Sequence, residues 1–540
     1  MTTAATTRVL QLLRNRPWTS SVVVGGTSLL SYAAIVESRA EWQERQSLKD
    51  PTKKGNAVTT LPRSYDWEII NSYWSSRPIT SLMRFVQIAY ELSPVVSRYI
   101  KDFVLFSPTP PTNVVVDDTI TKLQIYHASQ LRDSLTNLGP AFIKLGQQLS
   151  IRPDLVPHVV LKELQKLCDS VKPIPDDVAY EVIRNELHIE KLDTMFEDIT
   201  LVAAASLGQV YKAKLRRTNN EDGTDEEYVA IKVQRPGMER SFSLDLYLLR
   251  KMSILIDTFT SVFTNQPPFH QELYESFSNG SYMELDYENE AKNQKRFQEE
   301  LSQRNSPVII PNVYDQYSTR RVLTTQWIEG VKLADASQER IRQLIPVGVE
   351  LFLTQLLDVG AFHADPHPGN LLVTEDDGKL CLLDFGLCAE VDQKSRNAMT
   401  KAIVHLLMRD FDSLVAEDAK ELGFLPQDYD TSELKPLLIK ILTVGLLTES
   451  SSDLHKRKRK LMEISNELNE VFFRYPFSVP PFFALITRGL GLLEGIALTG
   501  DPDFDIFHAS VPYAKRRAVG LLGSHSLSKL RRMTGEASKY

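Results

Sequence analysis

Cysteine is scarce in this chain. Its 540 residues contain three, Cys168, Cys381 and Cys388. Their spacing forms neither a disulfide framework nor a cysteine-based metal site, which favours a reducing compartment. Cys381 and Cys388 flank the tripeptide Asp384-Phe385-Gly386, and a buried structural role is the preferred interpretation for both.

The chain also lacks an excess of positive charge, because 62 Lys and Arg are set against 69 Asp and Glu, for a net charge of −7. No broad basic surface is expected, and nucleic acid is therefore not an expected partner. The hydrophobic fraction of 42% and the charged fraction of 24% are ordinary for a globular protein. The length allows one large unit or several domains.

Long apolar runs are few. Residues 1–36 contain Arg8, Arg14 and Arg16, many Ser and Thr, and no acidic residue, which resembles an organelle transit peptide. Within them, residues 20–36 form an apolar stretch of small residues that is barely long enough to span a bilayer. A targeting-signal core, a single membrane anchor and an ordinary buried helix all stay open for this stretch.

The most informative part of the chain contains two short apolar runs, 371–373 and 380–383, on either side of an Asp-Gly turn. This pattern predicts a β-hairpin. The hairpin would bring Asn370 close to Asp384, with Asp365 on the loop just before. Two carboxylates and an amide oxygen in one place suit Mg²⁺. The Asp-x4-Asn spacing followed by Asp-Phe-Gly is that of a protein-kinase catalytic loop and its metal-binding turn.

Such a site needs a lysine upstream on a strand, and residues 228–233 (Tyr-Val-Ala-Ile-Lys-Val) supply Lys232. An unpaired ammonium that points inward costs several kcal/mol, so Lys232 needs a carboxylate or phosphates. Glu290, in the predicted helical segment 281–297, is the candidate partner, and Glu288 is the alternative.

Ahead of the lysine, residues 203–211 stand where a kinase has its phosphate-covering loop. Compared with G-x-G-x-x-G-x-V, they keep Gly208 and Val210 but have Ala203 and Ala205 in place of the first two glycines. Backbone N–H groups of this loop can still point at phosphates. Alanine tolerates positive φ poorly, at about 1–2 kcal/mol per residue, so a stiffer lid is expected. Each piece alone is weak, and the order of all the pieces carries the argument.

An apolar stripe at helical spacing precedes the loop, made of Leu131, Leu135, Leu138, Phe142, Leu145 and Leu149. Gly139-Pro140 would restart a helix with proline in its first position. On that second helix, Lys144 and Gln147 are three residues apart and share a face. From the residues alone, a packing stripe with a solvated polar flank is the favoured interpretation.

At these residues the chain resembles the UbiB/AarF atypical kinase-like family (aarF-domain-containing kinases), from about residue 120 to about residue 515. The family motifs are a KxGQ motif (Lys144-Leu145-Gly146-Gln147), an alanine-rich loop (203–209), an ExD motif (Glu284-Leu285-Asp286) and a modified catalytic loop (363–370). The amino-acid sequences of 202–214, 321–333 and 472–498 are most similar to the cyanobacterial and plastid branch of this family.

The resemblance implies binding of ATP and Mg²⁺. It assigns catalysis to Asp365, Lys232 and Asp384, and the metal to Asn370 and Asp384. The implied nucleotide contacts are Ala203, Ala204, Ala205, Ser206, Gly208, Gln209, Val210, Lys232, Glu290, Gln326 and Ile328. It prefers Glu290 over Glu288 as the lysine partner. It also places Lys144 and Gln147 over the nucleotide cleft, where Glu284 and Asp286 would pair with their helix or help to hold metal.

The expected fold class is α+β, a two-lobed protein-kinase-like fold with a family-specific N-terminal helical extension and an enlarged helical C-lobe. The expected divisions are 1–36 (targeting segment and/or single membrane anchor), 37–113 (linker and amphipathic helices), 114–198 (extension with the KxGQ motif), 199–330 (N-lobe), 331–515 (helical C-lobe) and 516–540 (basic tail). The polar residues 37–65 predict the linker.

After Leu387 a helical pattern resumes at once, and no Ala-Pro-Glu closes a long activation segment. The peptide-docking platform of a protein kinase is therefore missing, which argues against protein phosphorylation. Together with the resemblance, which implies a role in isoprenoid-quinone or prenyl-lipid metabolism, this leads us to expect an Mg-ATP-dependent atypical kinase or ATPase that acts on or regulates that metabolism. The resemblance also implies the expected partners, a membrane lipid or isoprenoid-quinone precursor and a biosynthetic complex at an organelle membrane. The branch that the chain resembles puts the plastid first, with the mitochondrion as the alternative.

Two other functions compete with this one. In the first, the chain is a nucleotide-binding pseudokinase scaffold that organises a membrane biosynthetic complex. In the second, His363, Asp365 and His367 are ligands in a metal hydrolase. The second leaves Lys232, Glu290 and Asn370 without a role, and it is disfavoured for that reason.

Overall fold

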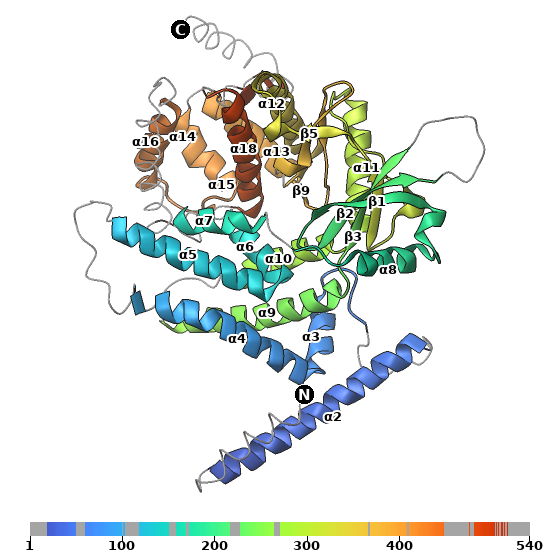
Figure 1. Cartoon of the computed structure of the whole chain (residues 1–540). Helices are drawn as coiled ribbons and strands as arrows, with labels where there is room; N and C mark the ends of the chain where they lie inside the picture. Colours follow the sequence, from blue (N-terminus) through green and yellow to red (C-terminus); the bar gives the residue numbers. More distant parts are fainter. Residues whose placement is uncertain are drawn as a thin grey trace, which may run out of the picture.

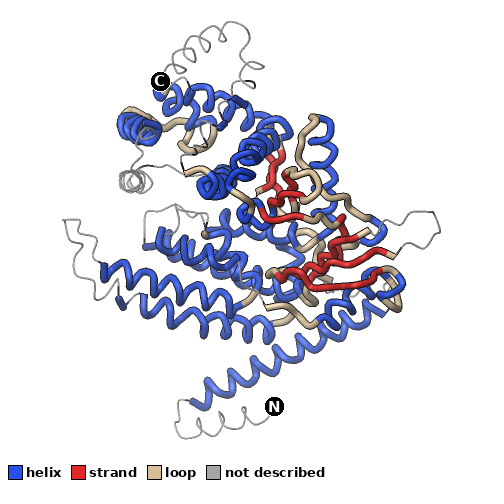
Figure 2. The backbone as a smooth tube through the Cα atoms, turned by 45° about the horizontal axis from the view of Figure 1, so that its top comes forward, coloured by secondary structure: helices blue, strands red, loops and turns tan. Residues whose placement is uncertain are grey.

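The structure is a computed structural model that describes most of the chain in separate stretches. These are residues 19–49, 60–99, 101–102, 118–150, 158–168, 172–216, 227–263, 270–364, 368–407, 410–447, 475, 480–502, 504, 506, 509–510, 512–513 and 516. Several predicted features lie outside them, namely Asp365 and His367, most of the loop after Arg216, the basic run 456–460 and the tail beyond 516. Helices dominate, and the strands gather in one half of the molecule (Figure 2).

A series of helices precedes the sheet (Figure 1). They are α2 (Thr19–Lys49), α3 (Trp67–Ser75), α4 (Pro78–Tyr99), α5 (Asp118–Leu138), α6 (Pro140–Leu149), α7 (His158–Gln165) and α8 (Asp176–Leu187). The helix predicted over 176–187 is thus present as α8.

Helix α2 corrects part of the predicted linker over 37–65, because it continues to Lys49. Glu37 accepts a hydrogen bond of 2.7 Å from the backbone N of Ile79, at the start of α4. Glu44 forms an ion pair of 2.7 Å with Arg77. A carboxylate is favoured at a helix N-terminus because it accepts from N–H groups that have no partner within the helix. The polar residues that suggested a linker therefore dock α2 on α4.

Residues 20–36 belong to α2. Among the helices in the described stretches, α2 included, none has the length and the apolar character needed to cross a membrane.

The apolar stripe over 131–149 lies on two helices that meet at Gly139. Gly139 has a φ of +99°, which glycine adopts readily, and Pro140 opens α6 as predicted. Stripe residues are buried in a core shared with α3, α9 (Met238–Phe263) and α10 (His270–Glu284). Helices α9 and α10 fall in the range assigned to the N-lobe, but their apolar faces pack with the extension.

The sheet has four antiparallel strands in sequence order, β1 (Phe196–Ala204), β2 (Gly208–Leu215), β3 (Tyr228–Gln234) and β4 (Val322–Gln326). It begins slightly before the predicted residue 199. Val229, Ile231 and Val233 are fully buried in a core with α8. Because alternate side chains of a strand point to opposite faces, Lys232 points to the other face.

The acidic segment predicted as one helix over 281–297 is two helices, α10 and α11 (Tyr287–Gln303), separated by Leu285 and Asp286. The Asp286 carboxylate accepts a hydrogen bond of 3.1 Å from the backbone N of Glu288 and caps α11. Aspartate is favoured at this position because it satisfies an N–H group that the helix leaves free. Apolar periodicity alone does not reveal such a break.

The C-terminal lobe is mainly helical. Its helices are α12 (Gln338–Leu353), α13 (Gln393–Leu407), α14 (Phe411–Ser413), α15 (Ala419–Glu421), α16 (Leu434–Leu447) and α18 (Pro481–Gly500). Helix α18 packs against α12 and buries Leu493, Ile496 and Ala497. The core-helix prediction for 477–498 is therefore confirmed for the described part.

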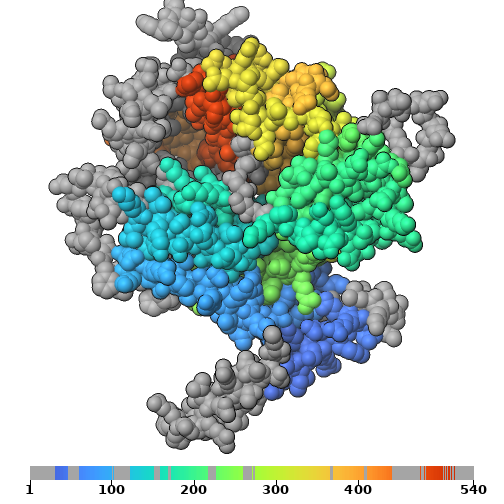
Figure 3. All heavy atoms as spheres, in the orientation of Figure 1, coloured from blue at the N-terminus to red at the C-terminus, as the bar shows by residue number. Residues whose placement is uncertain are grey.

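Short strands line the border between the lobes. Strands β7 (Leu371–Thr374) and β8 (Leu380–Leu382) form the predicted hairpin, and β7 also pairs with β5 (Gly330–Lys332). Strand β6 (Ala361–His363) pairs with β9 (Cys388–Glu390), from which the chain passes into α13 at Gln393. No extended activation segment occurs between β9 and α13, as expected. In the space-filling view the extension (cyan), the sheet (green) and the C-terminal helices (yellow to red) lie around a common centre (Figure 3).

Candidate active site

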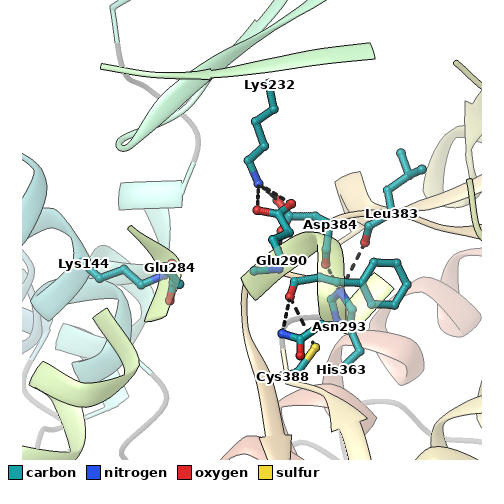
Figure 4. Close-up of polar contacts among 11 residues, drawn as sticks. Lys144, Lys232, Glu284, Glu290, Asn293, His363, Leu383, Asp384 and Cys388 are labelled. Atoms are coloured by element: carbon teal, nitrogen blue, oxygen red, sulfur yellow. Dashed lines mark hydrogen bonds and ion pairs between the residues drawn. The ribbon is translucent and has the colours of Figure 1, made fainter. Parts of the chain in front are cut away.

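Lys232 lies in the middle of the inner strand β3. Its Nζ donates to Glu290 of α11 at 2.7 Å and 2.8 Å, and to Oδ2 of Asp384 at 3.1 Å (Figure 4). The alternative partner, Glu288, pairs instead with Arg63 at 3.6 Å. A strand, a helix and the turn after a hairpin thus bring one ammonium and two carboxylates together.

The three side chains differ in exposure. Glu290 is 5% exposed, Lys232 23% and Asp384 43%. Glu290 therefore anchors the lysine from the buried side, and Asp384 presents its carboxylate on the open side.

The charges shift one another's pKa. Burial disfavours the ammonium of Lys232, but the carboxylates of Asp384 and Glu290 outweigh this and raise its pKa. Burial raises the pKa of Glu290 to about 7, with Lys232 opposing and Asp384 adding to the rise. At Asp384, burial acts to raise the pKa, but Lys232 and the N–H of Gly386 hold it at about 2. Because much of the Asp384 side chain is exposed, solvent relieves part of the burial effect there.

The backbone around Asp384 is tightly held. Oδ1 of Asp384 accepts a hydrogen bond of 3.1 Å from Gly386 N. His363 Nε2 donates to the carbonyl of Leu383 at 3.2 Å and to that of Asp384. Asn293 of α11 donates to the carbonyl of Phe385 at 3.1 Å. The turn is therefore fixed from both the helix and the neighbouring strand.

Asn370 lies beside this turn, because its carbonyl accepts a hydrogen bond of 2.8 Å from Leu383 N. The hairpin thus brings Asn370 and Asp384 to adjacent positions. Asp365 and His367 lie outside the described residues. His363 is 2% exposed and donates to backbone carbonyls, which is a structural role and not that of the metal ligand in the hydrolase hypothesis.

The alanine-rich stretch is a β-hairpin. Ala203 and Ala204 end β1, Gly208 begins β2, and Ala205 N donates to Gly208 O at 2.8 Å. Neither Ala203 nor Ala205 has a positive φ, so the backbone strain expected from alanine is absent. The reason is that the turn does not require the conformation that glycine favours. Ser206 lies within the turn and Val210 pairs with Lys232 across the strands.

The side chain of Gln209, one of the predicted nucleotide contacts, is directed away from Lys232. Its side chain is 1% exposed, accepts from Ile174 N at 3.0 Å and bonds to the hydroxyl of Tyr211. Strand alternation places it on the α8 face, away from Lys232. It joins β2 to the segment before α8.

The side chain of Gln326, also a predicted nucleotide contact, is directed away from Lys232 as well. It pairs with Val229, so its side chain lies on the face opposite Lys232, and it accepts from Asn312 N at 3.4 Å. Thr325, which pairs with Ala230, lies on the Lys232 face. Ile328 is half-buried between β4 and β5.

Lys144 of α6 forms an ion pair with Glu284 of α10 (Figure 4). Both side chains are largely buried, at 12% and 10% exposed. Gln147 donates to the carbonyl of Leu167 at 3.3 Å. Glu284 therefore pairs with the Lys144 helix, whereas Asp286 caps α11 and lies 3.7 Å from Arg320.

The two cysteines near the turn are poor nucleophiles. Cys381 is fully buried, and burial raises the pKa of its thiol to about 12. Burial also raises the pKa of Cys388, whose Sγ–H donates to the carbonyl of Phe385.

Three residues that lie on the Lys232 side of the sheet were not among the predicted site residues, namely Tyr287, Ala230 and Thr325. Tyr287 is one helical turn before Glu290, and the ammonium of Lys232 lies 5.2 Å from its ring centroid. The helical spacing of three from Glu290 could have identified it. Ala230 could have been identified because it is two residues before Lys232 on the same strand and therefore shares its face. Thr325 follows once the register of β3 and β4 is known, because it pairs with Ala230.

The chain is similar in sequence to known proteins. Residues 166–417 match the ABC1 atypical kinase-like domain. Protein ACTIVITY OF BC1 COMPLEX KINASE 3, chloroplastic, of Arabidopsis thaliana is 40% identical over 399 residues, which are 73% of this chain and 53% of that protein. The match thus spans about half the length of that relative.

Two uncharacterised proteins of Synechocystis are also similar. One is 34% identical over 496 residues, covering 90% of this chain and 68% of the relative. The other is 36% identical over 467 residues, covering 85% of this chain and 76% of the relative. With this identity and coverage, the mixed α+β architecture and the matched domain, the chain belongs to the ABC1/aarF family of atypical kinases.

Proposed function

We propose that this chain is an Mg-ATP-dependent atypical kinase or ATPase. The observation that carries the proposal is Lys232, held at 2.7 Å by Glu290 and at 3.1 Å by the partly exposed Asp384. An ammonium and a carboxylate that stand side by side at an opening suit phosphates and a divalent cation, respectively.

The residues present fit these groups. Mg²⁺ prefers oxygen ligands, and Asp384 has 43% of its side chain exposed, with Asn370 adjacent. Asp384 and Asn370 would hold the metal, and Lys232 would hold the phosphates. When bound, Mg-ATP supplies a transferable phosphoryl group.

The chain's own residues then act by position and charge. Both carboxylate oxygens of Glu290 accept hydrogen bonds from the Lys232 ammonium. Glu290 would therefore keep Lys232 in place while the ammonium turns from Asp384 to the phosphates. The tightly held turn keeps the Asp384 carboxylate aimed at the same space. We assign to Asp365 the orientation or deprotonation of the acceptor, water included. Phosphoryl transfer asks mainly for such positioning.

The acceptor we propose is a small molecule or lipid. The chain passes from β9 into α13 without a peptide-docking segment, and α6 is tied to α10 by Lys144 and Glu284. We propose action on, or regulation of, isoprenoid-quinone or prenyl-lipid metabolism at an organelle membrane, alone or within a biosynthetic complex. The family resemblance and the chloroplastic relatives favour a plastid, with the mitochondrion as alternative.

The second candidate is a nucleotide-binding pseudokinase scaffold. It is favoured by the bond between Lys232 and Asp384, since this bond engages both groups that phosphates and metal would need. In that case nucleotide binding would change the shape of the protein without turnover.

Single-turnover ATP hydrolysis by the wild type and by Asp384→Asn, with and without lipid, separates the two. We expect hydrolysis in the wild type and a loss of about 100-fold or more in the variant, the size typical for removal of one key electrostatic group. Asp376→Asn, at an exposed position in the turn of the same hairpin, is the control and should leave hydrolysis unchanged. Nucleotide binding without any Asp384-dependent hydrolysis would favour the scaffold.

A further inference from the structure

Tyr287 has a hydroxyl group that the fold does not satisfy. The side chain is 1% exposed, and its hydroxyl is buried without a hydrogen-bond partner. An unpaired buried hydroxyl is destabilising, so its presence in a native protein requires an explanation. The ring itself is well packed, against Ala291 and Leu323.

The hydroxyl lies at the end of the site where phosphates are expected. A Cβ built on Gly208, the first residue after the alanine turn, would lie 2.5 Å from it. The ammonium of Lys232 lies 5.2 Å from the centroid of the same ring. Tyr287 therefore stands between the turn of the β1–β2 hairpin and the lysine, on the same helical face as Glu290.

We propose that the Tyr287 hydroxyl is a further nucleotide-binding group, which donates a hydrogen bond to a phosphate oxygen of a nucleoside di- or triphosphate held by Lys232. This rests on the function proposed above and adds a ligand contact to it. A phosphate between the hairpin turn and Lys232 supplies the acceptor that the protein lacks. Hydrogen bonds to a charged acceptor are stronger than neutral ones.

The hydroxyl keeps its proton for this role. Burial raises the pKa of Tyr287, and the carboxylates of Glu290 and Asp384 add to the rise against the effect of Lys232. At any physiological pH the group is thus a donor. Adenosine, which has no phosphate, does not make this contact, and the contact therefore discriminates between nucleotides and nucleosides.

The test is calorimetric binding of MgADP and of adenosine to the full chain, in the wild type, Tyr287→Phe and Tyr282→Phe. Tyr282 is the matched control, because it is 1% exposed and packs in the helical core against Tyr65. We expect Tyr287→Phe to weaken MgADP about tenfold, the size of one hydrogen bond to a charged group, and to leave adenosine unchanged. Tyr282→Phe should change neither.

The stability of the nucleotide-free protein supplies a second readout. Because the hydroxyl has no partner, Tyr287→Phe should keep the wild-type melting temperature or raise it, while the added stabilisation by MgADP shrinks. If Tyr287→Phe binds MgADP with wild-type affinity, or loses equal affinity for MgADP and adenosine, the role assigned to Tyr287 is overturned while the proposed function still stands. A wild type that binds no MgADP overturns both the assignment and the proposed function.

Discussion

Asp384 adopts a backbone conformation that few non-glycine residues adopt, with a φ of +56°. Such residues cost on the order of 1–3 kcal/mol and persist where their surroundings enforce them. Here the surroundings are His363 on the carbonyl, Gly386 on the carboxylate and Asn293 on the next carbonyl. These hydrogen bonds enforce the strained conformation and thereby hold the Asp384 carboxylate beside Lys232, where the proposed metal site lies.

Glu290 predicts a pH dependence of stability. Burial raises its pKa from the ordinary 4.5 to about 7. Between these values the folded protein holds a proton that the unfolded chain has released, so the free energy of unfolding falls as the pH rises from about 4.5 to about 7. The effect is on the order of 1–3 kcal/mol, and Glu290→Gln lacks it.

Urea unfolding from pH 5 to pH 8 measures this. The free energy of unfolding of the wild type minus that of Glu290→Gln should decrease over the window and then level off. Glu288→Gln, at a side chain that is 42% exposed, is the control and should show no such trend. A difference that does not vary with pH would mean that Glu290 is not a buried titrating group.

At the residue scale the sequence identified Lys232, Glu290 and Asp384 as neighbours, because their motifs have characteristic spacing. It did not show that the side chains of Gln209 and Gln326 lie on the opposite face of the sheet from Lys232, since motif matching ignores which face of a strand a side chain occupies. The spacing of three from Glu290 could have placed Tyr287 beside the site, but its unsatisfied hydroxyl becomes visible only when its three-dimensional neighbours are known.

Among the elements, the β1–β2 hairpin depends on close contact at Gly208. A Cβ there would lie 2.4 Å from the carbonyl oxygen of Val233 as well as 2.5 Å from the hydroxyl of Tyr287. The backbone oxygen cannot move without breaking the pairing between β2 and β3. Glycine is therefore needed at this position for space and not for its φ.

Gly208→Ala should lower the free energy of unfolding by about 1–3 kcal/mol, the usual cost of overpacking, and weaken nucleotide binding as the strands separate. Gly280→Ala on α10 is the control, because no atom lies within 4 Å of its Cβ and alanine favours a helix. The control should be neutral or slightly stabilising. Thermal and urea unfolding report the effect, and equal stability of Gly208→Ala and wild type would refute the contact.

The elements were predictable to different degrees. The hairpin of β7 and β8 followed from an Asp-Gly turn between apolar runs, and the start of α6 followed from Gly139-Pro140. The break between α10 and α11 did not, because it depends on a single capping side chain, Asp286. Local rules find turns with strong residue preferences and miss breaks within a polar helical segment.

At the scale of the molecule, the helical extension is joined to the kinase-like core by α9 and α10. Apolar packing supplies most of the contact, and the Lys144–Glu284 ion pair adds a largely buried polar link. The family resemblance anticipated the polar link, because it paired Glu284 with the Lys144 helix, but the apolar packing of α9 and α10 with the extension was not visible in the sequence. The α+β class and the kinase-like fold were predicted, because the order of the motifs follows the chain of a kinase.

A double-mutant cycle on Lys144→Ala and Glu284→Ala tests that link. Because both side chains are nearly buried, we expect a coupling free energy of about 1–3 kcal/mol in unfolding. The exposed pair Lys295–Asp315, with side chains 38% and 73% exposed, is the control and should give a value near zero. Equal coupling free energies for the two pairs would mean that the Lys144–Glu284 pair stabilises the contact between α6 and α10 no more than an exposed ion pair does.

The proposed metal–nucleotide site is tested most directly by electron paramagnetic resonance of Mn²⁺, which replaces Mg²⁺ at oxygen-rich sites. With ADP present, we expect about one bound Mn²⁺ per wild-type chain, and loss of that bound signal in Asp384→Asn but not in Asp376→Asn. Equal Mn²⁺ binding by the wild type and Asp384→Asn would contradict a metal–nucleotide site built on Lys232, Glu290 and Asp384.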